Sequence, residues 1–192
     1  MYLLNPPDTM AYINLPTQLP GIRGLMAFRP TIAAPLNGLA EALLRTDEGI
    51  SKGERELIGT LVSALNGCVF CQSVHGAVAQ YYFKNQPDLI AQVKADYHTA
   101  PIPDKLKALL EIAEKVQQGG KHVTEQHIQA ARVHGASDLE IHDTVLIAAA
   151  FCMFNRYVDG LGTFTPTDSA FFQERGRKIA EETGYAGSDP HQ

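Results

Sequence analysis

The 192-residue sequence predicts an all-α protein. From Gly21 onward apolar residues recur with helical spacing, and no alternating run of Val, Ile and Thr is long enough to indicate a strand. Residues that typically begin or end helices also flank several of these segments. A chain of this length buries roughly 70% of its unfolded surface when it folds as one unit. Residues 1–192 are therefore expected to form a single domain.

The order of the expected elements follows from composition and periodicity. Residues 1–20 hold four of the 11 prolines and little periodicity, which predicts an irregular N-terminal arm. The helices expected after it are Thr31–Leu44, Ser51–Leu65, Cys68–Lys84, Pro87–Asp96, Asp104–Gln118, Thr124–Val133, Ser137–Asp159 and an amphipathic one near Asp168–Glu182. Residues 183–192 are expected to be a frayed tail.

Particular residues justify these helix ends. Ser51 and Glu54 form a capping-box pattern, and Pro87 suits a first helical turn. Gly119-Gly120 and Gly135 are typical left-handed stops. The middle of Ser137–Asp159 is apolar on all sides, which predicts the central helix of a bundle.

Charge and composition exclude several classes of function. The chain has 45% apolar and 19% charged residues, which is typical of a globular protein. Its 16 Lys and Arg are scattered among 21 Asp and Glu, for a net charge of −5, so neither a nucleic acid nor an anionic membrane is expected as a partner. The longest apolar run, Thr144–Phe154, is too short to span a membrane. No basic region precedes an apolar stretch at the N-terminus, so we expect no signal peptide and a cytoplasmic location.

The chemically informative residues are two cysteines and a histidine. Cys68, Cys71 and His75 are spaced i, i+3 and i+7, which places them at about 0°, −60° and −20° on a helical wheel and so on one face. Cys68 follows the turn-prone pair Asn66-Gly67 and should open its helix, where the helix dipole is expected to lower the pKa of its thiol. Cys71 has His75 one turn later as a base, which favours Cys71 as the nucleophile.

Two other interpretations compete with redox chemistry. Isolated cysteines and histidines are most often packing residues, but three on one face favour a functional site. A zinc site would need a fourth ligand besides these three side chains. The available candidates are Cys152, His98, His122, His127, His134 and His142. None of them forms a second paired motif, and Cys152 lies in an apolar run that indicates packing, so we expect no metal.

An acid on the preceding helix is placed to assist the histidine. Glu56, Thr60 and Ser63 form a stripe of polar or small residues opposite the apolar side of Ser51–Leu65. If the Asn66-Gly67 turn folds the two helices into a hairpin, Glu56 can face the cysteine helix and orient His75. Glu54 competes with it, although the capping box already uses Glu54. The polar residues Asn155, Arg156, Tyr157 and Asp159, at the end of the central helix, suggest a hydrogen-bond network rather than catalysis.

These residues resemble the alkylhydroperoxidase D-like branch of the carboxymuconolactone decarboxylase superfamily. The resemblance rests on the spacing of Glu56, Cys68, Cys71 and His75, and on the later block Asn155–Gly162. It extends over roughly residues 17–165, and Leu19–Ile22 is similar to the longer peroxidase-related members. The alkylhydroperoxidase itself has a histidine between the cysteines, where this chain has Phe70.

The resemblance implies an AhpD-like helical bundle that associates through its helices as a trimer or hexamer. It also implies a peroxidase without haem, flavin or metal, in which Cys71 attacks the peroxide, Cys68 resolves the product as a disulfide, His75 accepts a proton and Glu56 stands behind it. The expected partners are a peroxide substrate and a dithiol or lipoyl-type reductant. Alternatives are a thiol-disulfide oxidoreductase for which peroxide is a minor substrate, and a zinc-binding or purely structural oligomer.

Overall fold

The computed structural model describes residues 11–187, and over that range the protein is helical without a strand. The α-helices are α1 (Ile22–Phe28), α2 (Pro30–Leu44), α3 (Lys52–Leu65), α4 (Val69–Tyr82), α5 (Leu89–Asp96), α6 (Asp104–Gln118), α7 (Glu125–Val133), α8 (Asp138–Gly160) and α9 (Ser169–Lys178). A short 3-10 turn, η1 (Gly120–His122), follows α6, and a π-helical turn, η2 (Ile179–Thr183), follows α9. The predicted all-α class is confirmed.

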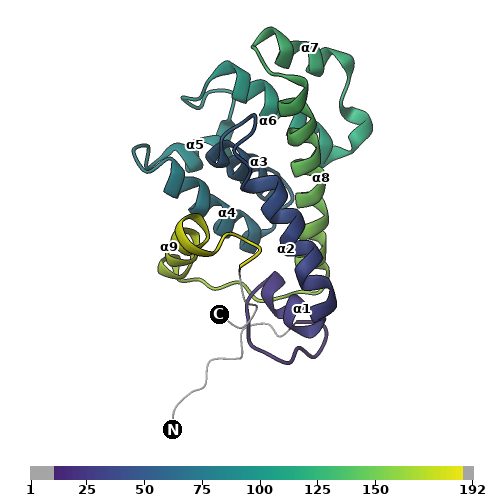
Figure 1. Ribbon diagram of the computed structural model, residues 1–192, viewed down its shortest axis with the longest axis vertical. Coiled ribbons are helices and arrows are strands. Elements are labelled where there is room, and N and C mark those ends of the chain that lie inside the picture. The colour runs from purple at the N-terminus through teal and green to yellow at the C-terminus, as the bar shows by residue number, and fades with distance from the viewer. Residues whose placement is uncertain (1–10, 188–192) are drawn as a thin grey trace.

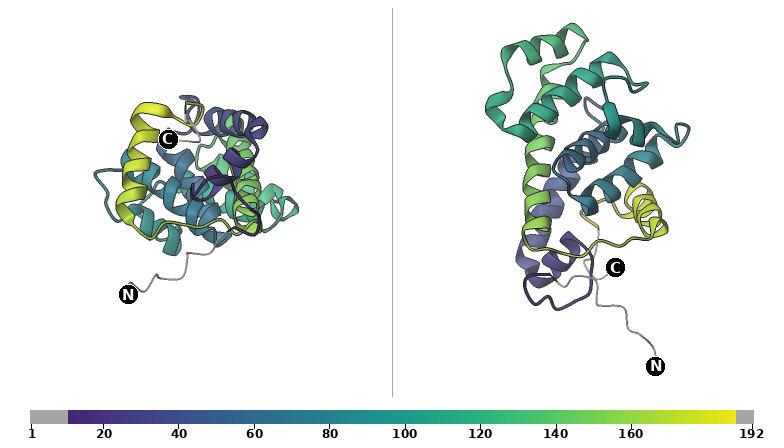
Figure 2. Two further views of the ribbon diagram at one scale, coloured as in Figure 1. Left: turned by 90° about the horizontal axis from the view of Figure 1, so that it is seen from below. Right: turned by 180° about the vertical axis from the view of Figure 1, so that it is seen from behind.

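The helices pack around α8, which runs along the long axis of the molecule (Figure 1). Helices α3 and α6 pack on α8, and α4 packs on α3. Helix α9 returns the chain to α4 (Figures 1 and 2). One buried apolar core joins these helices, with Leu57, Val78, Leu109 and Ile147 among the residues that have no exposed surface. Helix α4 therefore lies between α3 and α9, and these two helices supply most of its surroundings.

Most expected helix ends agree closely with the structure because local hydrogen bonds define them, but Pro87, expected in a first helical turn, lies in the turn before α5, which begins at Leu89. Ser51 and Glu54 form the predicted capping box at the start of α3. Gly135 has φ +87° after α7, as the predicted stop requires. After α6, Gly119 has φ +148° and ψ +132° instead of a left-handed helical conformation, and Gly120 begins η1. Helix α1 is a further difference, since no helix was expected before Thr31. It has seven residues and no side-chain cap at Gly21, so its stability comes from the burial of residues such as Leu25.

Helix α8 is less enclosed than its apolar sequence predicts. Ile147, Ala148 and Phe151 are buried, but Leu146 is 40% exposed and Met153 is 44% exposed. The helix is central as expected, since α3 and α6 pack on it, but its apolar middle is not buried all round in the single chain. One stripe of α8 faces outward because no other described helix of the chain packs there.

The predicted terminal segments are partly described. Residues 11–20 have no regular helix, as expected for the arm, and its residues 1–10 lie outside the described residues. In the tail, residues 188–192 also lie outside them, but residues 183–187 are not frayed. Tyr185 is 8% exposed, and its backbone N–H donates to Glu41 Oε2 at 2.6 Å. The carboxylate of Glu41 thus holds the chain after α9 against α2.

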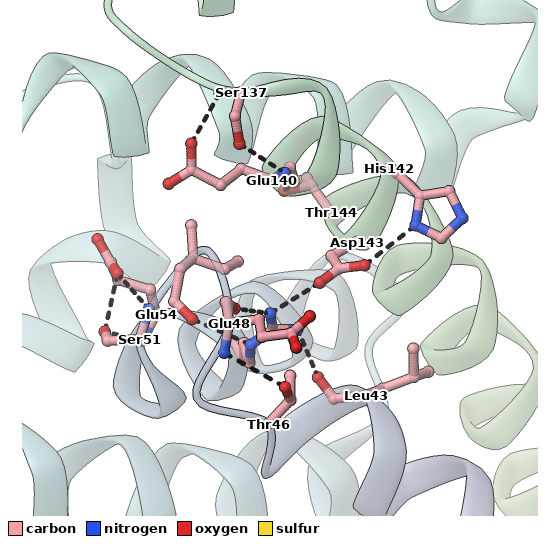
Figure 3. A network of polar contacts seen from close by, with 12 residues as sticks. Leu43, Thr46, Glu48, Ser51, Glu54, Ser137, Glu140, His142, Asp143 and Thr144 are labelled. Atoms are coloured by element: carbon pink, nitrogen blue, oxygen red, sulfur yellow. Dashed lines mark hydrogen bonds and ion pairs between the residues drawn. The ribbon is translucent and has the colours of Figure 1, made fainter.

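A buried arginine connects α3 to its neighbours. Arg55 has no exposed surface and donates hydrogen bonds to the carbonyl oxygens of Ile50, Leu43 and Glu48. It also forms an ion pair with Asp143 of α8 at 2.7 Å. Figure 3 shows Asp143 between this cluster and His142, which shares the carboxylate. The network fixes the start of α3 relative to α2 and α8, and hence the position of Glu56, the next residue.

No helix in the described part of the chain is both long enough and apolar enough to cross a membrane.

Candidate functional site

The α3–α4 hairpin forms as the Asn66-Gly67 pair predicts. Gly67 has φ +75°, a left-handed conformation that favours glycine, and Cys68 then caps α4 in an extended conformation. The backbone N–H of Cys68 donates to the Ser63 carbonyl at 2.9 Å. This tight connection places the first turn of α4, with Cys68 and Cys71, beside the end of α3.

The predicted stripe of small and polar residues on α3 faces α4. Glu56, Thr60 and Ser63 have no exposed surface. The Thr60 hydroxyl donates back to the Glu56 carbonyl at 2.7 Å, and a Cβ on Gly76 of α4 would lie 3.5 Å from Thr60 Cγ2. Because the facing side chains are small, the two helices approach closely and enclose the carboxylate of Glu56.

Glu56 is bound to His75 as the helical wheel predicts. His75 Nδ1 lies 2.8 Å from Glu56 Oε2, and the Tyr185 hydroxyl donates to Glu56 Oε1 at 2.7 Å. A carboxylate accepts hydrogen bonds, so the Nδ1–H of His75 and the hydroxyl of Tyr185 both donate to Glu56. The other ring nitrogen, Nε2, is then left without a proton and can act as a base. Of the two acids considered, Glu56 meets the histidine, while Glu54 serves the capping box.

Aromatic rings fix the plane of the imidazole. The Tyr185 ring stacks on His75 with centroids 5.6 Å apart and an interplanar angle of 20°. Phe151 of α8 meets His75 edge-on at 4.5 Å. With Nδ1 also bound to Glu56, the ring of His75 is restrained in both position and tautomer.

The two cysteines have different access to solvent and ligands. Cys71 lines a cavity of about 70 Å³ together with His75 and Tyr185, whereas Cys68 has no exposed surface and does not line it. The rest of the wall is largely apolar and includes Met26, Leu36, Phe70, Val74, Phe154 and Ile179. Phe70, the residue between the cysteines, forms part of this wall and packs over Gly21, where any Cβ would collide with its ring. A molecule that enters the cavity therefore meets Cys71 first.

The expected effect of the helix dipole on Cys68 is wrong. Its pKa is raised well above the ordinary thiol value, first by hydrogen bonding to Cys71 and then by burial. Cys68 is thus a protonated thiol at neutral pH. Its S–H can donate to Cys71, which lines the cavity.

Cys71 and His75 share the cavity but do not form a hydrogen bond with each other in the described structure. Proton transfer between them therefore needs a small side-chain movement or a bridging molecule in the cavity. Catalytic hydrogen bonds are often longer without substrate.

Three residues of the site were missed at the sequence level. Tyr185 lies in the segment expected to fray, and its only signal was an aromatic residue among glycines and alanine. Arg23 of α1 and Arg175 of α9 also line the cavity, from helices far apart in sequence. Nothing in the local pattern of either helix indicated that they converge on Cys71.

The remaining candidates lie elsewhere. Cys152 is 9% exposed and buried, which agrees with a packing role. Asn155 is buried and donates to Ser63 Oγ at 3.0 Å, as a structural network requires, but Arg156 and Asp159 are exposed and Tyr157 is half-buried. Among residues 11–187, no group of three or more His, Cys, Asp or Glu side chains is arranged so that it could hold a metal ion.

Comparisons with known proteins agree with this architecture. Residues 30–81, which span α2 to α4 and contain all four predicted site residues, match the model of the Carboxymuconolactone decarboxylase family. Among curated proteins, none matches the chain significantly.

Solved structures share the fold over most of the chain. An alkylhydroperoxidase AhpD core protein from Ralstonia eutropha JMP134, described as an uncharacterized peroxidase-related protein, has 28% identity and a TM-score of 0.76, covering 88% of this chain and 97% of its own. An uncharacterized peroxidase-related protein from Silicibacter sp. TM1040 has 24% identity and a TM-score of 0.72, covering 82% and 81%. A protein of unknown function from Agrobacterium tumefaciens, suggested to be the antioxidant defence protein AhpD, has 20% identity and a TM-score of 0.63, covering 75% and 97%.

The matched segment includes the helix hairpin that carries Glu56, Cys68, Cys71 and His75, and the solved structures extend the likeness to the surrounding helices. Residues 30–81 are therefore similar to the Carboxymuconolactone decarboxylase family, and the described chain has the AhpD-like fold.

Proposed function

We propose that the protein is a thiol-dependent alkyl hydroperoxidase that uses Cys71 as the attacking thiol and Cys68 as the resolving thiol. The observation that carries this proposal is the asymmetry of the pair, since Cys71 lines the cavity with His75 while Cys68 lies buried behind it. The 28% identical structure, which is described as peroxidase-related, supports the same class of activity.

The first step transfers one oxygen atom to sulfur. His75 Nε2 takes the thiol proton of Cys71, and the S–H of Cys68 can donate a hydrogen bond to the thiolate that forms. The thiolate attacks the peroxide, the O–O bond breaks, and sulfur becomes a sulfenic acid while the peroxide leaves as an alkoxide. The proton held on His75 converts the alkoxide to an alcohol, and Glu56 stabilises the imidazolium in between.

The second step forms the disulfide. The Cys68 sulfur attacks the sulfenic sulfur of Cys71, and the displaced hydroxyl leaves as water with the Cys68 proton. An external dithiol, such as a lipoyl-type reductant, then reduces this disulfide by thiol–disulfide exchange and is itself oxidised to a disulfide, which restores the thiols of Cys68 and Cys71. Neither step requires a metal or an organic cofactor.

We also infer that the protein assembles as a homo-oligomer, a trimer or a hexamer, through its helices. The outward stripe of α8 includes Leu139, Leu146 and Met153, spaced seven residues apart and each at least 40% exposed. A second copy of the chain would cover this apolar stripe. Light scattering after size-exclusion chromatography tests this, and a monomer at micromolar concentration would overturn it.

Peroxide consumption with a panel of dithiol reductants tests the function. We expect turnover with an organic hydroperoxide, loss of turnover in Cys71→Ser, and a trapped sulfenic acid at Cys71 in Cys68→Ser. Cys152→Ala is the matched control and should retain the rate, because Cys152 lies outside the cavity lining. Rapid reduction of small disulfides with no consumption of any peroxide would favour the oxidoreductase alternative, and a sulfenic acid at Cys68 in Cys71→Ser would reverse the two roles.

A further inference from the structure

Two positive charges face the cavity next to Cys71. Arg23 and Arg175 both line it, and Arg23 is 7% exposed. Arg175 is partly buried and makes no side-chain hydrogen bond or ion pair with any residue of the described chain. Arg177, two residues later on α9, contrasts with it because it pairs with Glu174, Glu181 and Glu182 at the surface.

The position of Arg175 is electrostatically unfavourable without an anion. Burial, and to a lesser extent the nearby positive charge of Arg23, lower its pKa to about 10. The guanidinium is still charged at neutral pH, so the cavity carries positive charge among largely apolar walls. Desolvated charges in proteins are normally paired, and a carboxylate matches the fork of a guanidinium with two parallel hydrogen bonds.

The size and walls of the cavity fit an organic molecule. A single water needs roughly 10–15 Å³, and this cavity holds about 70 Å³. Hydrogen peroxide alone would leave the apolar wall of Phe70, Val74 and Ile179 without a partner. A carbon chain would cover that wall and connect a charged end near Arg175 with a reactive end near Cys71.

We propose that the preferred substrate is an organic hydroperoxide that also carries a carboxylate, which Arg175 binds with the help of Arg23. This inference rests on the proposed peroxidase function and specifies its substrate class. The carboxylate is unchanged in the reaction: Cys71 takes one oxygen from the hydroperoxide group, the O–O bond breaks, and the product is the corresponding hydroxy acid.

The test compares a fatty-acid hydroperoxide with its methyl ester, which has the same carbon chain and hydroperoxide group but carries a small uncharged ester in place of the carboxylate. Reduced protein is mixed with each peroxide without a reductant, quenched with a thiol-alkylating reagent and analysed by mass, so that only the attack by Cys71 is measured. We expect the acid to react at least tenfold faster than the ester. Arg175→Gln should bring the acid-to-ester ratio close to one, and Arg175→Lys should restore part of it. Arg177→Gln removes the same charge from the same helix and should leave both rates unchanged.

A binding measurement separates this inference from the proposed function. Calorimetry with octanoate and with octanol, on wild type and Arg175→Gln, needs no turnover. Peroxide consumption with equal rates for acid and ester, and no preference for octanoate, would overturn the carboxylate site and leave the peroxidase intact. Octanoate binding that depends on Arg175, with no consumption of any peroxide, would support a carboxylate-binding site but overturn the proposed peroxidase function. A third outcome is that acid and ester oxidise Cys71 at equal rates, while reduction of the Cys68–Cys71 disulfide is faster with a reductant that carries a carboxylate. That outcome would assign the carboxylate to the reductant and overturn the substrate proposal.

Discussion

Replacing Glu56 by glutamine should slow peroxide attack by about 10- to 100-fold at neutral pH. The carboxylate accepts one hydrogen bond from His75 Nδ1 at 2.8 Å and one from the Tyr185 hydroxyl at 2.7 Å, and it has no exposed surface. Glutamine offers one oxygen in place of two, so either His75 or Tyr185 then faces an NH₂ group. If the NH₂ group faces His75, the imidazole proton moves to Nε2 and the base toward Cys71 is lost.

The magnitude follows from the charge that forms in this step. When His75 takes the thiol proton, its bond to Glu56 becomes an ion pair, and a hydrogen bond to a charged group contributes about 1.5–3 kcal/mol. Since about 1.4 kcal/mol corresponds to a factor of ten, its loss gives the stated range. Removal of the whole base in His75→Ala should cost more, about 10²- to 10⁴-fold.

The assay is the single-turnover reaction of reduced protein with tert-butyl hydroperoxide, read beside the melting temperature. Glu54→Gln is the matched control, because it makes the same chemical change two residues earlier on α3, where a glutamine still completes the capping box. It should react at the wild-type rate. A Glu56→Gln protein that is folded and reacts as fast as wild type would refute the relay through His75.

Two further predictions concern the scaffold. Gly59→Ala should lower the free energy of unfolding by about 1–3 kcal/mol, since the added Cβ would lie 2.3 Å from the ring of Phe151. Gly38→Ala is the control: an added Cβ there has no atom within 4 Å, so the change should be neutral or stabilise the protein by up to about 1 kcal/mol. Equal melting temperatures of the two variants would contradict this. Burial by itself would raise the pKa of Asp143, but hydrogen bonds from His142 and Arg55 outweigh it and hold that pKa below its ordinary value. A carboxylate whose pKa is lower in the folded than in the unfolded state stabilises the protein fully above the unfolded value of about 3.9, and this stabilisation is lost as the pH falls through the folded value. Asp143→Asn should therefore lower the free energy of unfolding by about 3 kcal/mol at pH 7 and by progressively less below pH ~3.9. Urea unfolding across pH measures this difference.

Most of the fold follows from patterns that act over a few residues. Ser51 with Glu54 and Ser137 with Glu140 satisfy the free N–H groups at the starts of α3 and α8. Those bonds are local, so the sequence alone places the helix starts. Helix α1 carries no such signal at Gly21 and exists through its packing, which explains why it was not predicted.

For the candidate site, helical spacing by itself determined that Cys68, Cys71 and His75 share one face, because side-chain direction on a helix depends only on position along the chain. That Glu56 faces them depended in addition on the hairpin at Asn66-Gly67. Only the tertiary structure decided that Cys71 lines the cavity while Cys68 is buried, since access depends on how α1, α2 and α9 cover the first turn of α4. The same holds for Arg175 on α9 and for Tyr185 in the turn after η2, which reach the site from about a hundred residues further along the chain. Burial, charge and access at these positions depend on which distant segments meet, and no local pattern carries that information.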